Sequence, residues 1–324
     1  MVENLPEGPA SDPSVRVLYI GGTGRTGSTL LSSLLGQYPA FFSAGEVAFL
    51  WRFGLVEGGL CSCGTPIREC RVWLSIFDRA YGGLEHVDGA EMVRIRRKFN
   101  SVHLPLMVTN RQRERLMHRA STFSEATERL YNGIAAATGS RVVVDSSKEP
   151  HYSYILRECR SLDVRFLHLV RDPRAVAYSW QRRKAETGLG GGAYMERRRP
   201  TKSAAYFDVS NVAAEVMWAR EEHRYLRIRY EDFIARPGET LRTIAAFAGE
   251  AIDPSSVIHG DGAELAGTHS VWGNPNRFDR GRVTLGRDDA WRHALSRVDQ
   301  GVVTAATLPL LRHYRYPVWV HARG

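Results

Sequence analysis

Nine residues at positions 21–29, "GGTGRTGST", directly follow an apolar run at 15–20 and have the glycine spacing of a phosphate-binding loop. Three interpretations overlap there. The Gly-x-Gly-x-x-Gly pattern matches the dinucleotide fingerprint, and Glu46 lies at roughly the distance of the acid that binds the ribose. The stretch nearly matches the P-loop of kinases and ATPases, but Ser28 occupies the position of the lysine. The third interpretation is a loop for a nucleotide that carries a group other than a phosphoryl group.

The segment "HLVRDPRAVAYSW" at 168–180 favours the third interpretation. Arg171 follows a predicted strand at 164–170, and Ser179 lies two turns into the following helix, so both can donate to one anion. This second phosphate site, on a different strand from the glycine loop, suits a nucleotide that is phosphorylated at both ends of its ribose. Neither ATP nor NAD requires that arrangement.

The sequence here resembles the sulfotransferases that use 3′-phosphoadenosine-5′-phosphosulfate (PAPS). Four motifs in order carry the resemblance, which runs from about residue 15 to 315: "GRTGSTLL", "LVRDPRAVAYSW", "LRIRYEDFIARPGETLRTIAAFAG" and "NPNRFDRGRVTLGRDDAWRHAL". It implies a sulfotransferase domain over 15–320 that moves a sulfuryl group from PAPS to a hydroxyl of a small-molecule, glycan or lipid acceptor, with an amine as second choice. The alternatives are a P-loop-type small-molecule kinase and a non-catalytic nucleotide-binding protein of this fold.

The resemblance also implies donor-binding residues. They are Arg25, Thr26, Gly27, Ser28 and Thr29 for the 5′-phosphosulfate, Arg171 and Ser179 for the 3′-phosphate, Arg280 and Gly281 as a clamp on the same phosphate, and Tyr230 against the adenine. Backbone N–H groups at the start of a helix suit anionic oxygens. Arg25 is expected to stabilise the charge that builds on the bridging oxygen. The alternative for Arg25 is a solvated loop arginine, and for Tyr230 a packed strand-end tyrosine.

The catalytic base implied by the resemblance is Glu46, which ends "AGE". In tyrosylprotein sulfotransferases a Gly-Glu-Glu segment at nearly this distance supplies the base, whereas here a single Glu precedes Val47, so the register is open by one position. Lys148 in "DSSK" resembles the lysine that stabilises the bridging oxygen in that branch, with Asp145 or Ser147 orienting it. Helix N-capping is the alternative role for the residues before the lysine.

His103 in "VHLPL" resembles the "THLP" histidine of cytosolic sulfotransferases, but it lies 68 residues before Arg171 instead of on the strand just before it. We interpret His103 as a surface or packing histidine. The Gly- and Arg-rich segment 185–203, with 190–192 and 197–199, is a candidate acceptor lid or a solvated loop.

The elements that position these residues alternate between strand and helix. Strands are predicted at 15–20, 141–145, 164–170 and 225–230, and helices at 28–37, 111–138, 149–159, 173–183, 204–223 and 237–249. Residues 51–110 are expected to be irregular, and 252–290 to be a Gly- and Arg-rich loop. Alternation with nearly continuous apolar strands predicts one α/β domain with a central, mostly parallel sheet flanked by helices.

The chain has 324 residues and a net charge of +9, from 44 Lys and Arg against 35 Asp and Glu. A basic excess favours anionic partners, but the arginines are dispersed, so we expect no nucleic-acid binding. Residues 1–14 are expected to be a disordered leader without a signal pattern. No run of about 18 apolar residues occurs, so we expect a cytoplasmic protein with no transmembrane segment. The Arg-rich composition and the N-terminal leader favour a bacterial enzyme of specialised metabolism or of glycolipid modification.

Three cysteines are clustered at Cys61, Cys63 and Cys70. Their spacing lacks the paired CxxC of zinc knuckles, and no histidine lies among them, so we favour a tight loop with semi-buried thiols over a metal site. An internal disulfide is the other alternative. No metal is expected for the reaction.

Overall fold

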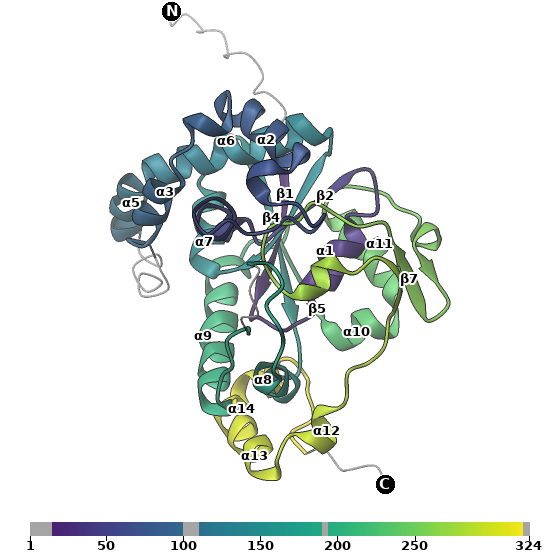
Figure 1. Cartoon of the computed structure of the whole chain (residues 1–324). Helices are drawn as coiled ribbons and strands as arrows, with labels where there is room; N and C mark the ends of the chain where they lie inside the picture. The colour runs from purple at the N-terminus through teal and green to yellow at the C-terminus, as the bar shows by residue number, and fades with distance from the viewer. Residues whose placement is uncertain (1–14, 100–109, 190–193, 320–324) are drawn as a thin grey trace, which may run out of the picture.

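A computed structural model describes residues 15–99, 110–189 and 194–319. Its centre is a five-stranded, all-parallel sheet in the order β2-β3-β1-β4-β5 (Figure 1). The strands are β1 Val15–Gly22, β2 Phe41–Gly45, β3 Val142–Lys148, β4 Leu162–Val170 and β5 Tyr225–Arg229. The predicted α/β architecture is thus confirmed. The predicted leader at 1–14 and His103 lie outside the described residues.

Helices cover both faces of the sheet (Figure 1). They are α1 Ser28–Leu35, α2 Arg71–Tyr81, α3 Gly89–Arg96, α5 Asn110–Arg119, α6 Ser121–Thr138, α7 Pro150–Arg157, α8 Pro173–Gln181, α9 Pro200–Trp218, α10 Tyr230–Ala235, α11 Pro237–Phe247, α12 Trp291–Ala294, α13 Arg297–Ala306 and α14 Leu308–His313. Successive residues of a strand point to opposite faces. Val17 and Tyr19 of β1 therefore pack with α2, α6, α7 and α9, whereas Leu18 and Ile20 pack with α1, α10 and α11.

Three expectations about the elements were wrong. Residues 51–110 contain α2 and α3, and the single helix predicted at 111–138 is two helices, α5 and α6. Residues 252–290 contain a small antiparallel sheet of β6 Ile258–His259, β7 Gly262–Leu265 and β8 Gly281–Thr284. Strands this short carry too few residues for an alternating pattern, and α3, with eight residues, is too short to show a clear helical one.

The carboxyl ends of all five strands meet at one edge of the sheet, because all five are parallel. In spatial order this edge presents Glu46 after β2, Lys148 at the end of β3, the loop 23–27 after β1, Arg171 after β4 and Tyr230 after β5. Ligands of open α/β sheets bind at this edge. Residues that the sequence spreads over 200 positions are thereby brought to one place.

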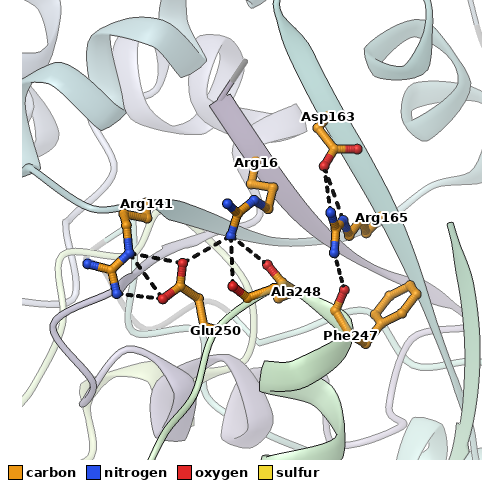
Figure 2. Close-up of polar contacts among 8 residues, drawn as sticks. Arg16, Arg141, Asp163, Arg165, Phe247, Ala248 and Glu250 are labelled. Atoms are coloured by element: carbon orange, nitrogen blue, oxygen red, sulfur yellow. Dashed lines mark hydrogen bonds and ion pairs between the residues drawn. The ribbon is translucent and has the colours of Figure 1, made fainter. Parts of the chain in front are cut away.

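The opposite edge is tied to the C-terminal end of α11 by arginines (Figure 2). Arg16 of β1 donates to the Ala248 carbonyl oxygen (3.0 Å) and to Glu250 (3.0 Å), and Arg141 donates to the same carboxylate (2.9 Å). Arg165 of β4 donates to the Phe247 carbonyl oxygen (2.6 Å). Cations suit the unpaired carbonyl groups at a helix C-terminus.

We expect Glu250→Gln to lower the free energy of unfolding at neutral pH by about 1 kcal/mol, since one partner, Arg141, is solvent-exposed and screened. Hydrogen bonds and charge from Arg141, then from Arg16, hold the pKa of Glu250 below its usual range. The stabilisation that comes from this lowered pKa is fully present above the pKa of the unfolded state. It is lost as the pH falls through the pKa of the folded state. Urea unfolding at pH 7 and at about pH 3 should therefore show the difference between wild type and variant shrinking in acid. A difference that does not depend on pH would contradict this.

Of the helices in the described part of the chain, none has the length and apolar character that a membrane crossing requires.

Candidate functional site

A cavity of about 770 Å³ opens at the carboxyl edge of the parallel sheet. Of the residues predicted from the sequence, the following line it: Arg25, Gly27, Ser28, Thr29, Glu46, Lys148, Arg171, Ser179 and Tyr230. They come from all five strand ends and from α1 and α8. The fold thus gathers nearly the whole predicted site.

Three predicted donor-binding residues are not among those that line the cavity. Thr26 is buried under the loop, where its hydroxyl donates to the Thr23 carbonyl oxygen (3.2 Å). Arg280 is exposed, and Gly281 begins β8 beside it. Two later residues of β8, Val283 and Thr284, line the cavity instead.

The loop between β1 and α1 has the backbone of an anion cradle. Gly22, Arg25 and Gly27 have positive φ angles of 114°, 71° and 90°. Gly27 is needed for a second reason, because a Cβ there would lie 2.7 Å from the Tyr230 ring. The first N–H groups of a helix have no partner within it, so the start of α1, at Ser28, offers donors to an anion in the cavity.

The side chain of Arg25 lies over Trp180, with the guanidinium carbon 4.6 Å from the ring centroid. Its nearest recorded polar contact is the Met195 sulfur, at 3.4 Å from Nη2. Burial lowers the pKa of Arg25, the nearby Glu46 carboxylate acts in the opposite direction, and Arg198 lowers it further. In residues 15–99, 110–189 and 194–319, no carboxylate pairs directly with this guanidinium. A partly buried cation with that environment is suited to an external anion.

Arg171 forms a second cationic centre. Its Nη1 donates to the Arg25 carbonyl oxygen (3.2 Å), and its Nη2 donates to Asp288 Oδ2 (3.2 Å). The guanidinium carbon lies 4.3 Å from the centroid of the Tyr230 ring. Its Nε is buried and has no hydrogen-bond partner in the described structure. With Ser179, 8% exposed, beside it in the cavity lining, this group has the spare donors that a phosphate requires.

Glu46 and Lys148 form an ion pair, with Lys148 Nζ 2.5 Å from Glu46 Oε1. Both side chains are largely buried, at 13% and 10% exposure. The lysine also donates to the Ser146 carbonyl oxygen, and its backbone has a positive φ of 68°. A left-handed conformation is uncommon for a residue other than glycine, so the fold holds Lys148 in place at some cost. The two predicted catalytic groups are therefore one unit.

The pairing of β3 with both neighbouring strands is irregular next to this unit. The register of β3 shifts against β1 between Tyr19 and Gly21, and against β2 between Ser43 and Gly45. Bulges of this kind redirect side chains next to functional sites. Here the shift places Lys148 opposite Gly21, at the mouth of the loop.

Asp145 supports the Glu46–Lys148 pair without touching it. Its carboxylate accepts hydrogen bonds from the Ser147 backbone N–H (2.7 Å) and hydroxyl and from the Tyr131 hydroxyl. The Ser147 hydroxyl oxygen in turn accepts from the Ala48 N–H (3.0 Å), two residues after Glu46. Burial raises the pKa of Asp145 to about 6, against hydrogen bonds from Ser147 and Tyr131 that lower it. The predicted orienting residues thus position the Glu46 segment.

Aromatic side chains form one part of the wall, which also contains charged and polar residues. Phe53 stacks on Trp272 with ring centroids 3.6 Å apart, and Phe49 lies beside them in the lining. On the other side, Trp180 meets Tyr206 edge-to-face. Phe49, Phe53 and Trp272 thus give the cavity an aromatic surface that shares its lining with Glu46.

The segment 185–203, predicted as a lid or a solvated loop, contributes to the wall, and its residues 200–203 belong to helix α9 instead of a loop. Met195 N–H donates to the Lys184 carbonyl oxygen (3.0 Å), and Ala185 pairs with Tyr194 in a bridge. Arg198 lies over Trp180, with its guanidinium carbon 4.0 Å from the ring centroid, so this ring contacts both Arg198 and Arg25. Residues 190–192 lie outside the described residues, and the lid remains a prediction.

Sequence reasoning missed several lining residues. Trp180 directly follows Ser179 and ends the segment 168–180. Its place next to a predicted phosphate ligand could have indicated that it lines the cavity. Arg198 belongs to the arginine run 197–199 of the predicted lid, whereas Asp288 reaches Arg171 from 117 positions away and was not singled out. The second arginine of the "RDPR" motif, Arg174, is structural: it is 2% exposed and pairs with Asp172 at 2.7 Å.

Comparisons with known proteins show the family and the fold of the chain. A family model described as "Sulfotransferase family" matches residues 18–254. The fold is similar to the sulfotransferase domain from the Synechococcus PCC 7002 olefin synthase, with a TM-score of 0.54, 19% identity, and coverage of 97% of this chain and 99% of that one. It is also similar to the sulfotransferase domain from the curacin biosynthetic pathway, with a TM-score of 0.51, 17% identity, and coverage of 95% and 100%. No curated protein matches the sequence.

Proposed function

Because the chain belongs to the sulfotransferase family, we propose that it transfers a sulfuryl group from PAPS to a hydroxyl of a small-molecule, glycan or lipid acceptor. One observation carries the proposal: two separate cationic centres, Arg25 and Arg171, face one cavity that also holds the Glu46–Lys148 pair. A donor with a 5′-phosphosulfate and a 3′-phosphate needs two such centres. A nucleoside triphosphate needs only one.

In the proposed reaction the acceptor oxygen attacks the sulfur while the bond from sulfur to the 5′-phosphate oxygen breaks. Glu46 accepts the acceptor's proton, so that a sulfate ester and 3′-phosphoadenosine-5′-phosphate are formed. Arg25 and the N–H groups at the start of α1 stabilise the negative charge that develops on the departing phosphate. Lys148 can act on both the base and the departing phosphate. Its Nζ contacts Glu46, and its backbone pairs with Gly21, near the end of the strand that precedes the glycine loop.

The aromatic surface supports an acceptor with a flat or apolar face next to its hydroxyl. The acceptor oxygen must lie next to Glu46 for proton transfer. The same cavity is lined by Phe49 and by the stacked rings of Phe53 and Trp272. Aromatic faces bind both rings and the apolar faces of sugars through contact area and ring electrostatics.

The test is transfer of radiolabelled sulfate from PAPS into a panel of aromatic, glycan and lipid hydroxyl acceptors. The proposal expects a labelled ester and stoichiometric 3′-phosphoadenosine-5′-phosphate from at least one acceptor class. Labelled phosphate transfer from ATP to the same panel, without sulfate transfer from PAPS, would contradict it and support a kinase.

We expect Asp288→Asn to tighten the binding of 3′-phosphoadenosine-5′-phosphate about fivefold, because an ion pair whose carboxylate is partly exposed to solvent contributes about 1 kcal/mol. Asp288 occupies Arg171 Nη2 and adds a negative charge next to the proposed phosphate position. Calorimetric titration measures the change. Asp279→Asn is the matched control, since Asp279 lines the same cavity and is not paired with Arg171. Weaker binding in the Asp288 variant would show instead that this carboxylate orients the arginine.

A further inference from the structure

The three clustered cysteines lie next to His269, a histidine about 200 positions later in the chain. Cys61, Cys63, Cys70 and His269 each direct one ligand atom into a common centre, and these atoms all lie within 4.8 Å of one another. Cys61 and Cys70 are buried, and the other two are partly buried. The sequence interpretation rejected a metal because no histidine lies among the cysteines. The fold supplies one from about 200 positions later.

Three of the distances between the ligand atoms match those of a tetrahedral zinc site, and all four atoms lie within 4.8 Å of one another. With bonds of about 2.3 Å to sulfur and about 2.0 Å to nitrogen, a tetrahedral centre separates two sulfurs by about 3.8 Å, and sulfur from nitrogen by about 3.5 Å. The Cys63 and Cys70 sulfurs are 3.8 Å apart. His269 Nδ1 is 3.6 Å from the Cys61 sulfur and 3.4 Å from the Cys70 sulfur. The cysteines are free thiols, so no disulfide competes for these ligands.

The backbone around the cluster is held on both sides. Cys61 N–H donates to the Thr65 carbonyl oxygen (2.8 Å), which closes the cysteine loop. Ser62 donates through its hydroxyl to the Thr268 carbonyl oxygen (2.6 Å). Trp73 Nε1 donates to the His269 carbonyl oxygen (2.8 Å). The histidine is therefore fixed next to the cysteines by contacts that do not involve its ring.

We infer that Cys61, Cys63, Cys70 and His269 bind a structural Zn²⁺ ion. Three thiolates and one imidazole form a closed set with no open position for a substrate, which is the composition of structural rather than catalytic zinc sites. Binding takes a hydrated Zn²⁺ and releases the thiol protons, with no change of oxidation state.

The ion holds one wall of the cavity in place. Two residues after His269, Val271 pairs with β2: its N–H donates to the Ala44 carbonyl oxygen (2.9 Å), and its carbonyl oxygen accepts from the Glu46 N–H (2.9 Å). The next residue, Trp272, is the ring that stacks on Phe53. The zinc site therefore anchors the segment that carries backbone contacts to Glu46, and acts as a positioning element.

The test is the metal content of the full-length protein, expressed with zinc in the medium and analysed by plasma mass spectrometry after gel filtration. We expect one zinc ion per chain, loss of zinc in Cys63→Ser and His269→Gln, and retention in Cys159→Ser, the matched control. Cys159 is buried elsewhere, beside Ser124. Chelation should lower the melting temperature of the wild type and leave that of His269→Gln unchanged.

Measurements on the wild type test the inference even if the variants fail to fold. Replacement of the metal by Co²⁺ should give thiolate-to-cobalt charge-transfer absorption and the visible bands of a tetrahedral ion. A wild-type protein that holds no zinc as purified, and none after anaerobic reconstitution with zinc chloride, would overturn the inference. Zinc that stays bound in folded Cys63→Ser and His269→Gln would also overturn it, because the ion would then lie elsewhere.

Discussion

Glu46→Gln is expected to lower kcat for sulfate transfer by about 10²–10⁴-fold, the range of positioned general bases. Glutamine keeps the size of the side chain and can still contact Lys148, but it cannot accept the acceptor's proton. The effect should therefore fall on kcat, with the affinity for 3′-phosphoadenosine-5′-phosphate unchanged. Initial rates with the acceptor found in the panel and calorimetry with the nucleotide measure the two quantities.

Glu196→Gln is the control for this variant. Its carboxylate lines the same cavity but pairs with Lys202 and Arg198, away from Lys148. It should keep wild-type kcat, since charge in the cavity is changed without loss of the base. If Glu46→Gln and Glu196→Gln retain the same rate, Glu46 is not the base, and a water or the acceptor's own acidity takes that role.

Arg25→Ala is expected to lower kcat by about 10²–10³-fold, which is the cost of removing one preorganised donor to a developing negative charge. The guanidinium lies over Trp180 and does not pair with a carboxylate in the described part of the chain, so its removal should leave the melting temperature nearly unchanged. Arg25→Lys should recover part of the rate, because the charge is restored without the planar donor pair.

The comparison for this variant is Arg197→Ala. Arg197 is exposed and donates to the Gln181 carbonyl oxygen (2.7 Å), outside the cavity lining. Arg197→Ala should retain full activity. That result would show that loss of one positive charge from this basic protein does not by itself lower kcat. An Arg25→Ala enzyme whose kcat matches that of Arg197→Ala would place the transition-state charge elsewhere, with Lys148 as the next cation to test.

The donor side of the site could be predicted because its information is local. The glycine loop and "RDPRAVAYS" each consist of a strand end, a turn and a helix start, and parallel strands bring such segments to one edge. Arg25, Arg171 and Ser179 consequently line one cavity as expected. The short-range spacing of these motifs is set by the turn itself, so the motifs can be recognised without knowledge of the rest of the fold.

Contacts made by long-range chain returns could not be predicted. Asp288 reaches Arg171 from 117 positions away, and His269 reaches Cys61 from 208 positions away. Neither residue has a local pattern, since each depends on where a loop crosses the sheet edge. The predicted clamp of Arg280 and Gly281 shows the reverse case: the motif is present, but the chain places its later residue Thr284 at the cavity.

The affinity of the protein for 3′-phosphoadenosine-5′-phosphate relative to ADP, measured by calorimetry with and without Mg²⁺, tests the central claim most directly. Charge-assisted hydrogen bonds from Arg171 and Ser179 to the 3′-phosphate predict tighter binding of the bisphosphate by about 10–100-fold. This preference should disappear in Arg171→Ala. Equal affinity for the two nucleotides in the wild type, or a preference for ADP with Mg²⁺, would contradict the account.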